Sequence, residues 1–315
     1  MGRSRTVAAT ADGCWDTFAG FGRPAYRFPV AWAGVQPDGC GPVPRACLAF
    51  YDRLVDRLLD KGVTPIATLY QWDLPQAIDE AGGWASRDTA LRFGEYTAAV
   101  HDALGDRVRL WTTLDEPSRA AFLGYAQDPV AALRSAHHLL LGHGLAVSQI
   151  RDRAPEQEVS IVLNLTTVLV DRDDHAHTAA FRKVDGLRNR FFLDPLFGRG
   201  YPADVLADTA WLGPWDSAVL DGDLDLVAEP VNWYGVTYYG PTRVVPAEDA
   251  LDVTGAGHPG LRGVRLLAPH FSDGHFPDDS DEAFAELMLR LSIDYPELPL
   301  MVTEHTPRHP AAIAV

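Results

Sequence analysis

Short runs of apolar residues alternate along this 315-residue chain with longer segments whose apolar residues recur at helical spacing. A short, continuous apolar run is typical of a strand buried on both faces of a parallel sheet. The six runs that predict strands are Ala25–Trp32, Thr64–Tyr70, Val108–Leu114, Val159–Leu165, Trp233–Tyr239 and Pro299–Thr303.

The segments between these runs predict helices. Arg45–Lys61 carries a stripe of apolar residues three or four positions apart, and Arg87–Leu104 follows a helix-start signal at Ser86. Val130–Arg151, rich in Ala and Leu, and Thr178–Phe192 predict two further helices. Strands that alternate with helices in this way indicate βαβ units and a parallel sheet.

Stretches rich in Gly, Pro and Asp predict the connections. Residues 185–204 are expected to form the end of a helix and then a loop, and Asp221–Pro230 and Asp249–Gly263 are expected to be turn-rich loops. None of them has the composition of a flexible linker. We therefore expect a single domain over residues 1–315, with residues 1–13 as an atypical N-terminus.

Two folds are built from such units, the doubly wound sheet and the (β/α)8 barrel. No Gly-x-Gly-x-x-Gly motif follows the first strand, as a dinucleotide-binding sheet would require. Acidic and aromatic residues stand at strand ends, where barrel enzymes place their chemistry. We expect an α/β protein of (β/α)8 TIM-barrel type, incomplete because six of its eight strands are recognisable.

Charge and composition limit the kinds of binding partner that the chain is expected to have. The net charge of −16 and the pI of about 5.0 argue against nucleic acid or an anionic membrane, and no apolar run is long enough to span a bilayer. The cysteines at 14, 40 and 47 lack the spacing of a zinc site or a disulfide framework, and no metal or cofactor is expected. The first residues contain no apolar signal segment, so a cytoplasmic protein is expected.

Two glutamates stand at the ends of predicted strands. Glu116 follows the run that ends at Leu114, and Glu304 follows the run that ends at Thr303. The carboxyl ends of parallel strands meet at one edge of a barrel, and two carboxylates facing each other across a sugar carry out glycoside hydrolysis. The alternative for Glu116 is a surface glutamate that opens a helix before Pro117.

Other strand-end residues suit the same site. Arg27 is a candidate partner for Glu304, because a nucleophilic carboxylate must stay ionised. Gln71 and Trp72 combine an amide that hydrogen-bonds hydroxyls with an apolar face on which a sugar can stack, although a core tryptophan is the alternative. The pair Tyr238–Tyr239 could hydrogen-bond a strand-end carboxylate, although tyrosines in strands usually serve packing.

Several longer segments follow the order of one known family. They are YRFPVAW, FYDRLVDRLLDKGVTPIATLYQWDLPQAIDEAGGW, TLDEP, LNLTTV, GLRNRFFLDPLFGRGYP, YGVTYYGPTRV and PLMVTEH. Together they resemble glycoside hydrolase family 1, the β-glucosidase family of retaining (β/α)8-barrel enzymes. YRFPVAW is similar to that family's YRFSIAW, TLDEP to its TLNEP, and PLMVTEH to the strand that ends in its TENG. The resemblance covers most of residues 14–305.

The resemblance implies a retaining β-glycosidase that hydrolyses terminal β-D-glucosides or related β-glycosides. It implies Glu116 as the acid/base and Glu304 as the nucleophile, with Arg27 and Tyr238 supporting the nucleophile. In such a mechanism the two carboxyl groups lie about 5 Å apart. The residues that the resemblance places at the sugar are Gln71, Trp72 and Asp115.

The chain also departs from the family. Gln71 replaces a His, Asp115 replaces the Asn before the acid, and Thr237 replaces the Asn before the tyrosines. Asp115 removes an amide donor from the sugar and, if ionised, adds negative charge beside both glutamates. The segment after Tyr125 is shorter than the family's HAPG-type loop, and the family's first and eighth strands have no counterpart in these residues.

These departures leave alternatives open. One is a catalytically impaired or repurposed relative that binds a glycoside. A barrel without its first and last strands would have two open parallel edges, which favour association with another chain. A partner chain or a homo-oligomer that completes the barrel is therefore a further alternative.

Overall fold

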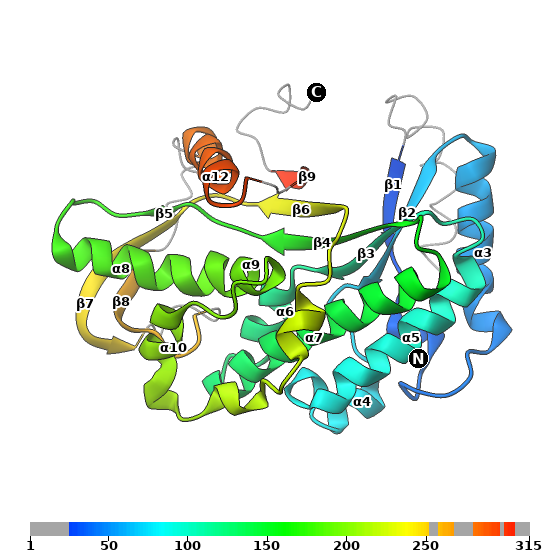
Figure 1. Ribbon diagram of the computed structural model, residues 1–315, viewed down its shortest axis with the longest axis horizontal. Coiled ribbons are helices and arrows are strands. Elements are labelled where there is room, and N and C mark those ends of the chain that lie inside the picture. The colour runs from blue at the N-terminus through cyan, green and yellow to red at the C-terminus, as the bar shows by residue number, and fades with distance from the viewer. Residues whose placement is uncertain (1–24, 252–257, 268–279, 297–298, 306–315) are drawn as a thin grey trace.

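The computed structural model describes residues 25–251, 258–267, 280–296 and 299–305 (Figure 1). Its main element is a curled sheet of six strands, each parallel to its neighbours. In order across the sheet they are β1 (Ala25–Pro29), β2 (Thr64–Tyr70), β3 (Leu110–Asp115), β4 (Glu158–Asn164), β6 (Trp233–Tyr238) and β9 (Leu300–His305). Each strand predicted from the sequence is present, and the prediction of a parallel sheet is confirmed.

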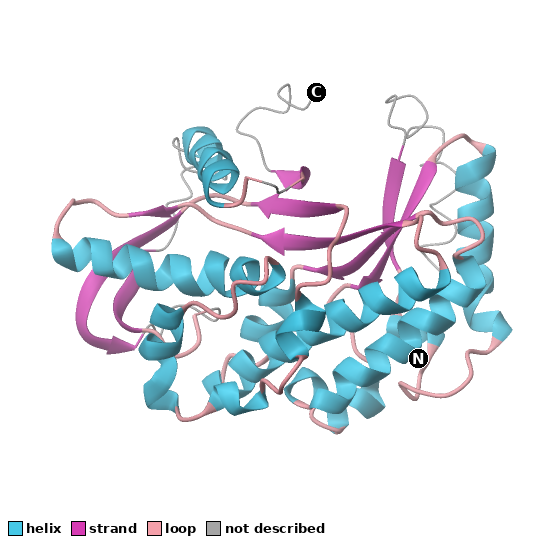
Figure 2. Ribbon diagram, viewed as in Figure 1, coloured by secondary structure: helices cyan, strands magenta, loops and turns pink. Residues whose placement is uncertain are grey.

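The predicted helices are also present. α3 (Arg45–Asp60), α5 (Arg87–Leu104) and α7 (Pro129–Arg153) fit the predicted segments to within two residues at each end. Most helices lie on one side of the sheet, whereas α12 lies beyond β6 and β9 (Figure 2). The other helices are α2 (Trp32–Val35), α4 (Gln76–Glu80), η1 (Gly83–Ala85), α6 (Pro117–Gly124), α10 (Ala203–Thr209), η3 (Ala210–Leu212), η4 (Trp215–Ala218), α11 (Asp223–Val227) and α12 (Ser280–Asp294).

The core lies between the sheet and the helices. Most residues of β2, β3 and β6 have branched or aromatic side chains, and nearly all of them are buried. α7 begins where the carboxylate of Asp128 accepts the backbone N–H groups of Val130 and Ala131, and its Ala- and Leu-rich surface is largely buried. Within the described ranges, no helix has the length and apolar character needed to cross a bilayer.

A predicted helix and a predicted loop are divided differently in the structure. The expected helix Thr178–Phe192 consists of α8 (His175–Asp185), the π-helical turn η2 (Gly186–Arg190) and α9 (Phe191–Leu196). The expected loop over 185–204 is therefore mostly helical. A π-turn costs hydrogen-bond geometry and frequently marks a functional site.

A small second sheet was not expected. It contains β5 (Val168–Leu169), β7 (Thr242–Leu251) and β8 (Arg262–Leu267), in that order. The prediction of a loop over Asp249–Gly263 is wrong at both ends, since residues 249–251 belong to β7 and residues 262–263 to β8. The prediction of a loop over Asp221–Pro230 is wrong in its middle, where α11 stands.

Candidate active site

The sheet places a group of charged and polar side chains at the carboxyl ends of its strands. β1 carries Arg27, the residues after β2 include Gln71 and Trp72, and β3 ends in Asp115. β9 carries Glu304, and Arg27 reaches it although β1 and β9 lie at opposite edges of the sheet. The curvature of the sheet therefore brings its two edges to one site.

Glu304 is held by one cation and one phenol. Nη2 of Arg27 donates to Oε1 at 2.8 Å, and the hydroxyl of Tyr239 donates to Oε2 at 2.5 Å. The side chain of Glu304 remains 41% exposed, so a reacting group can approach it. Burial, the hydrogen bond to Glu304 and the charge of Glu116 raise the pKa of Tyr239 well above its ordinary value. The pKa of the Tyr239 hydroxyl therefore depends on both glutamates.

The tyrosine that meets Glu304 is Tyr239 and not Tyr238, so the prediction for Tyr238 is corrected. Tyr238 is fully buried, and its ring lies 5.1 Å from that of Phe284, between centroids. Successive residues of a strand point to opposite faces, and the extended end of β6 directs only the second tyrosine toward the site.

Glu116 stands between β3 and α6 and is 1% exposed. Its backbone is left-handed, with φ 48° and ψ 62°, and its N–H donates to the carbonyl of Val162 at 2.9 Å. Oγ1 of Thr237 donates to its Oε1 at 2.7 Å, and Nη1 of Arg119 lies 3.9 Å from its Oε2. Glu116 does open a helix, but as a buried carboxylate and not as a surface residue.

Asp115 is a buried carboxylate, 1% exposed, that shares its cation with another acid. Nη1 of Arg27 lies 3.0 Å from its Oδ1, and Nε2 of Gln71 donates to its Oδ2 at 2.7 Å. Burial raises the pKa of Asp115, Arg27 opposes that effect, and the charges of Glu116 and Glu304 add to it, giving about 6. The Gln71 amide is thus engaged by Asp115, whose carboxylate occupies the position of an amide in the resemblance.

Trp72 forms an exposed wall of the site, with 39% of its surface accessible. Its Nε1 donates to the carbonyl of Asp115 at 3.0 Å, and the guanidinium of Arg119 lies 4.0 Å from its ring centroid. Among the described residues, Trp72 (φ 64°) and Glu116 are the two non-glycine positions with positive φ. Such strain is concentrated at functional sites because the surrounding structure must enforce it.

Two residues near the glutamates were not singled out from the sequence: Arg119 and Arg188. The guanidinium of Arg188, on the π-turn η2, is shielded from water, and this lowers its pKa while the charge of Glu116 raises it. Arg119 lies one helical turn after Glu116, and that spacing was a usable signal. Arg188 is 72 positions away (188 − 116), and no local pattern connects the two.

No three His, Cys, Asp or Glu side chains in the described ranges gather as metal ligands would. The site is instead composed of carboxylates, guanidiniums and aromatic rings. A curled parallel sheet with carboxylates at the carboxyl ends of its strands is typical of (β/α) barrels, which build their active sites at those ends.

The chain belongs to glycosyl hydrolase family 1, whose family model matches residues 15–306. It is 44% identical to thermostable beta-glucosidase B of Thermobispora bispora, over 91% of this chain and 59% of that protein. It is 38% identical to a bifunctional beta-D-glucosidase/beta-D-fucosidase of Bifidobacterium breve, over 89% of this chain and 63% of that protein.

Solved structures agree with this assignment. The crystal structure of a psychrophilic beta-glucosidase from Micrococcus antarcticus matches with a TM-score of 0.83 and 37% identity, over 91% of this chain and 65% of that one. The prediction of an incomplete TIM barrel with six recognisable strands is confirmed. The chain spans less than two thirds of the length of these three relatives.

Proposed function

We propose that this chain carries the active site of a retaining β-glycosidase that hydrolyses terminal β-D-glucosides or related small β-glycosides. Family membership supports the proposal, as do two named relatives that are β-glucosidases at 44% and 38% identity. The observation that carries it is geometric: Oγ1 of Thr237 donates to Glu116, Thr237 lies opposite Glu304 in the β6–β9 pair, and the hydroxyl of Tyr239, two residues further on, donates to Glu304. Two carboxylates that meet the same strand end suit action at one anomeric centre.

Glu304 is the proposed nucleophile. Arg27 and Tyr239 each donate a hydrogen bond to it, and these bonds stabilise the ionised form that attack requires. In the first step a carboxylate oxygen bonds to the anomeric carbon as the bond from that carbon to the leaving oxygen breaks. In the second step water replaces the carboxylate, which leaves ionised.

Glu116 is the proposed acid/base. Its Oε1 accepts from Thr237, while its Oε2 has no hydrogen-bond donor among the described residues and can carry the proton. In the first step Glu116 gives this proton to the leaving oxygen. In the second step it takes a proton from the attacking water and regains its starting state.

The sugar would lie against Trp72, Gln71 and Asp115. The exposed face of Trp72 offers a stacking surface. Gln71 and Asp115 hydrogen-bond each other, so a sugar hydroxyl must share or replace that bond. Because the pKa of Asp115 is about 6, its carboxyl changes from donor to acceptor near neutral pH.

The direct test is covalent trapping. The purified chain is incubated with a 2-deoxy-2-fluoro-β-D-glucoside that has an activated leaving group, and the labelled peptide is identified by mass spectrometry. The label should lie on Glu304 and be absent from the Glu304→Gln variant. Glu158→Gln, at an exposed glutamate that begins β4, is the matched control and should label normally. Absence of any adduct from the wild-type chain, with glucoside turnover no higher than that of Glu304→Gln, contradicts the proposal.

We also infer a single domain, because one buried apolar cluster includes residues of both sheets, such as Val236 and Val244. A cytoplasmic location is supported by Cys40 and Cys47, which are free thiols in the described part of the chain. One cooperative unfolding transition would support the single domain, and fractionation of the source cells tests the location.

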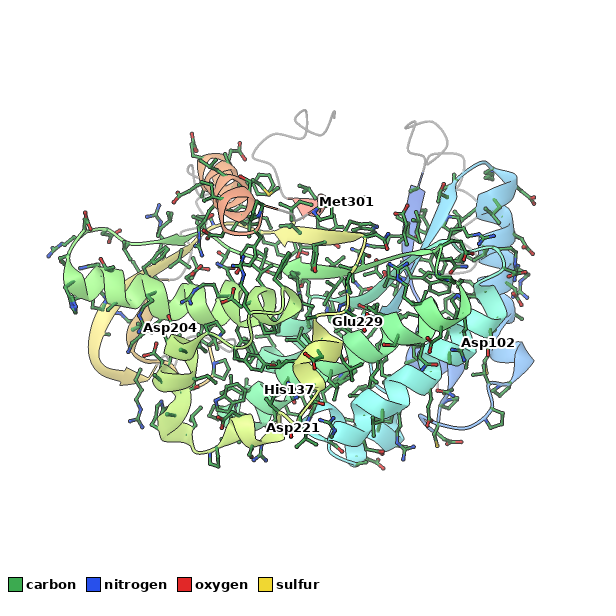
Figure 3. The ribbon with its side chains drawn as sticks, viewed as in Figure 1. Asp102, His137, Asp204, Asp221, Glu229 and Met301 are labelled. Atoms are coloured by element: carbon green, nitrogen blue, oxygen red, sulfur yellow. The ribbon has the colours of Figure 1, made fainter. Side chains whose placement is uncertain are left out.

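A homo-oligomer is proposed for a separate reason. Within the described sheet, β1 and β9 each pair on one side only, and β9 exposes Met301 and Val302 at 43% and 44% (Figure 3). An exposed strand edge with apolar side chains favours pairing with another chain. Sedimentation should show a dimer or larger species that Met301→Lys dissociates; a wild-type monomer contradicts the proposal.

A further inference from the structure

A pocket of about 370 Å³ lies on the helix side of β2, outside the group of catalytic carboxylates. It is bounded by the residues after β2, by α4 and η1, and by the end of α6. Trp72 is the residue that this pocket shares with the candidate active site. Its volume is in the range that holds small ligands.

One wall of the pocket comes from the short connection between α6 and α7, which contributes Tyr125. α6 ends at Gly124 and α7 begins at Pro129, so four residues connect them. The hydroxyl of Tyr125 accepts the backbone N–H of Trp84 at 2.7 Å and thereby fixes one wall. A side-chain Cβ added to Gly124, on the rim, would meet nothing within 4 Å.

The lining combines aromatic rings with negative charge. Tyr70, Trp84 and Tyr125 supply rings in addition to that of Trp72, and Asp73 and Asp79 supply two carboxylates. None of the lining residues is Lys or Arg. Burial raises the pKa of Tyr70 far above its usual range; the indole of Trp84 opposes that rise, and the charges of Asp73 and Asp79 add to it. Aromatic faces beside carboxylates attract organic cations.

The indole N–H of Trp84 is a buried hydrogen-bond donor without a well-placed acceptor among the described residues. The indole of Trp84 is 1% exposed, and its Nε1 makes no hydrogen bond of good geometry among the described residues, although the hydroxyl of Tyr70 lies near it. A buried N–H without a well-placed acceptor costs free energy, which a ligand oxygen would recover. We propose that this pocket binds a small organic cation that carries a hydroxyl group, with its charge toward Asp73 and Asp79 and its oxygen accepting from Trp84.

The test uses choline as the probe and 3,3-dimethylbutan-1-ol, which has the same shape without the charge, as its matched control. Binding to the full chain is measured by titration calorimetry and by the indole N–H signal of Trp84, assigned with Trp84→Phe. Choline should bind at least about tenfold more tightly than the alcohol, and salt should weaken it. Equal affinity for the two compounds, or no response to choline, overturns the proposal.

Two variants locate the site. Asp79→Asn should weaken choline binding several-fold. Gly124→Leu adds bulk at a lining position where a Cβ meets nothing within 4 Å, and it should abolish binding. Asp102→Asn is the control, because Asp102 pairs with Arg153 on the surface at 2.9 Å, far from the pocket. Binding that survives Gly124→Leu in a folded protein places choline elsewhere and contradicts the proposal.

This inference does not rest on glycoside hydrolysis. Choline binding is read without turnover, and covalent trapping at Glu304 is read without choline. Trapping with no choline response overturns the pocket proposal alone. A choline response with no trapping and no turnover contradicts the glycosidase proposal alone.

Discussion

Two aspartates of this protein are almost equally buried, and their surroundings differ. Asp223 begins α11 and is 2% exposed. Arg87 donates two hydrogen bonds to it, and Leu220 donates its backbone N–H at 2.8 Å. Nε2 of His137, a buried residue labelled in Figure 3, lies 3.0 Å away. Asp115 is 1% exposed, and within the described ranges its ion-pair partner is Arg27, which it shares with Glu304.

The difference appears in their acidity. Burial alone would raise the pKa of Asp223, but its hydrogen bonds from Arg87, Leu220 and His137 lower it to about 2. The pKa of Asp115 rises to about 6. Within this pair, the carboxylate with its own donors keeps a low pKa, whereas Asp115, which shares its cation and lies near two other carboxylates, has a raised pKa of the kind found at functional sites.

The largest expected effect is that of Arg27→Met, which removes the cation shared by Asp115 and Glu304. Removing a preorganised cationic donor from the reacting carboxylate raises the barrier by about 4 kcal/mol, so kcat/KM for an aryl β-glucoside should fall on the order of 1000-fold. Arg107→Met is the control, because Arg107 pairs with surface aspartates such as Asp52. A loss of less than about tenfold would show that Asp115 and Glu304 do not depend on the shared cation.

Asp223→Asn should act on stability instead of catalysis. It removes the charge that Arg87 and His137 contact, at a cost of about 3 kcal/mol in the free energy of unfolding at pH 7. Because the folded pKa is depressed, this stabilisation is present above pH 3.8 and is lost as the pH falls toward 2. Urea unfolding measures it. A slower trapping reaction at Glu304 in the folded variant would mean that this cluster also supports the site.

Asp115→Asn should have the opposite pH dependence. Below pH 3.8 the wild-type carboxyl is protonated both folded and unfolded, whereas above about 6 the folded protein must hold it ionised. The raised pKa therefore costs the wild type up to about 3 kcal/mol as the pH rises through this window, and the variant avoids that cost. The variant should gain stability relative to the wild type between pH 4 and pH 7. A difference independent of pH would contradict the assignment.

Asp115→Asn also tests how the charge of Asp115 affects catalysis. If the charge of Asp115 impairs the site, the asparagine introduced by Asp115→Asn restores an amide, and kcat/KM should rise several-fold at pH 7. An unchanged or lower rate would show that the carboxylate has its own use at the sugar. The pH profile separates the cases, because only the wild type should change near pH 6.

The fold could be predicted where local pattern and tertiary packing agree. α5 has the predicted bounds because Ser86, an apolar stripe and buried residues such as Phe93 all favour the same helix. β7 and β8 were missed because their pairing is non-local: Val244 lies opposite Leu266, and the segments alone resemble turns. The π-turn η2 breaks a continuous helical pattern, which periodicity cannot reveal.

The grouping of candidate residues could be anticipated where they lie on parallel strands. Arg27 and Glu304 form an ion pair because parallel strands present their side chains at a common edge, while the catalytic roles of Glu116 and Glu304 stay predictions. The effect of the Glu116 charge on Arg188 depends on where the tertiary fold places η2, which no local spacing encodes. Whether Tyr238 or Tyr239 points toward Glu304 depends on the orientation of the end of β6. A shift of one residue in a strand moves each side chain to the opposite face of the sheet.

The choice between these two tyrosines gives the most specific prediction. Tyr239→Phe removes the hydroxyl that donates to Glu304 at 2.5 Å and keeps the ring. A hydrogen bond to a charged group contributes about 1.5 kcal/mol, so the rate of trapping should fall roughly tenfold. Tyr238→Phe is the matched neighbour and should leave that rate unchanged, because its buried ring packs against Phe284 on the other side of the strand. If Tyr238→Phe slows trapping and Tyr239→Phe does not, the strand end faces the other way. Tyr239 is then not the residue whose hydroxyl donates to Glu304.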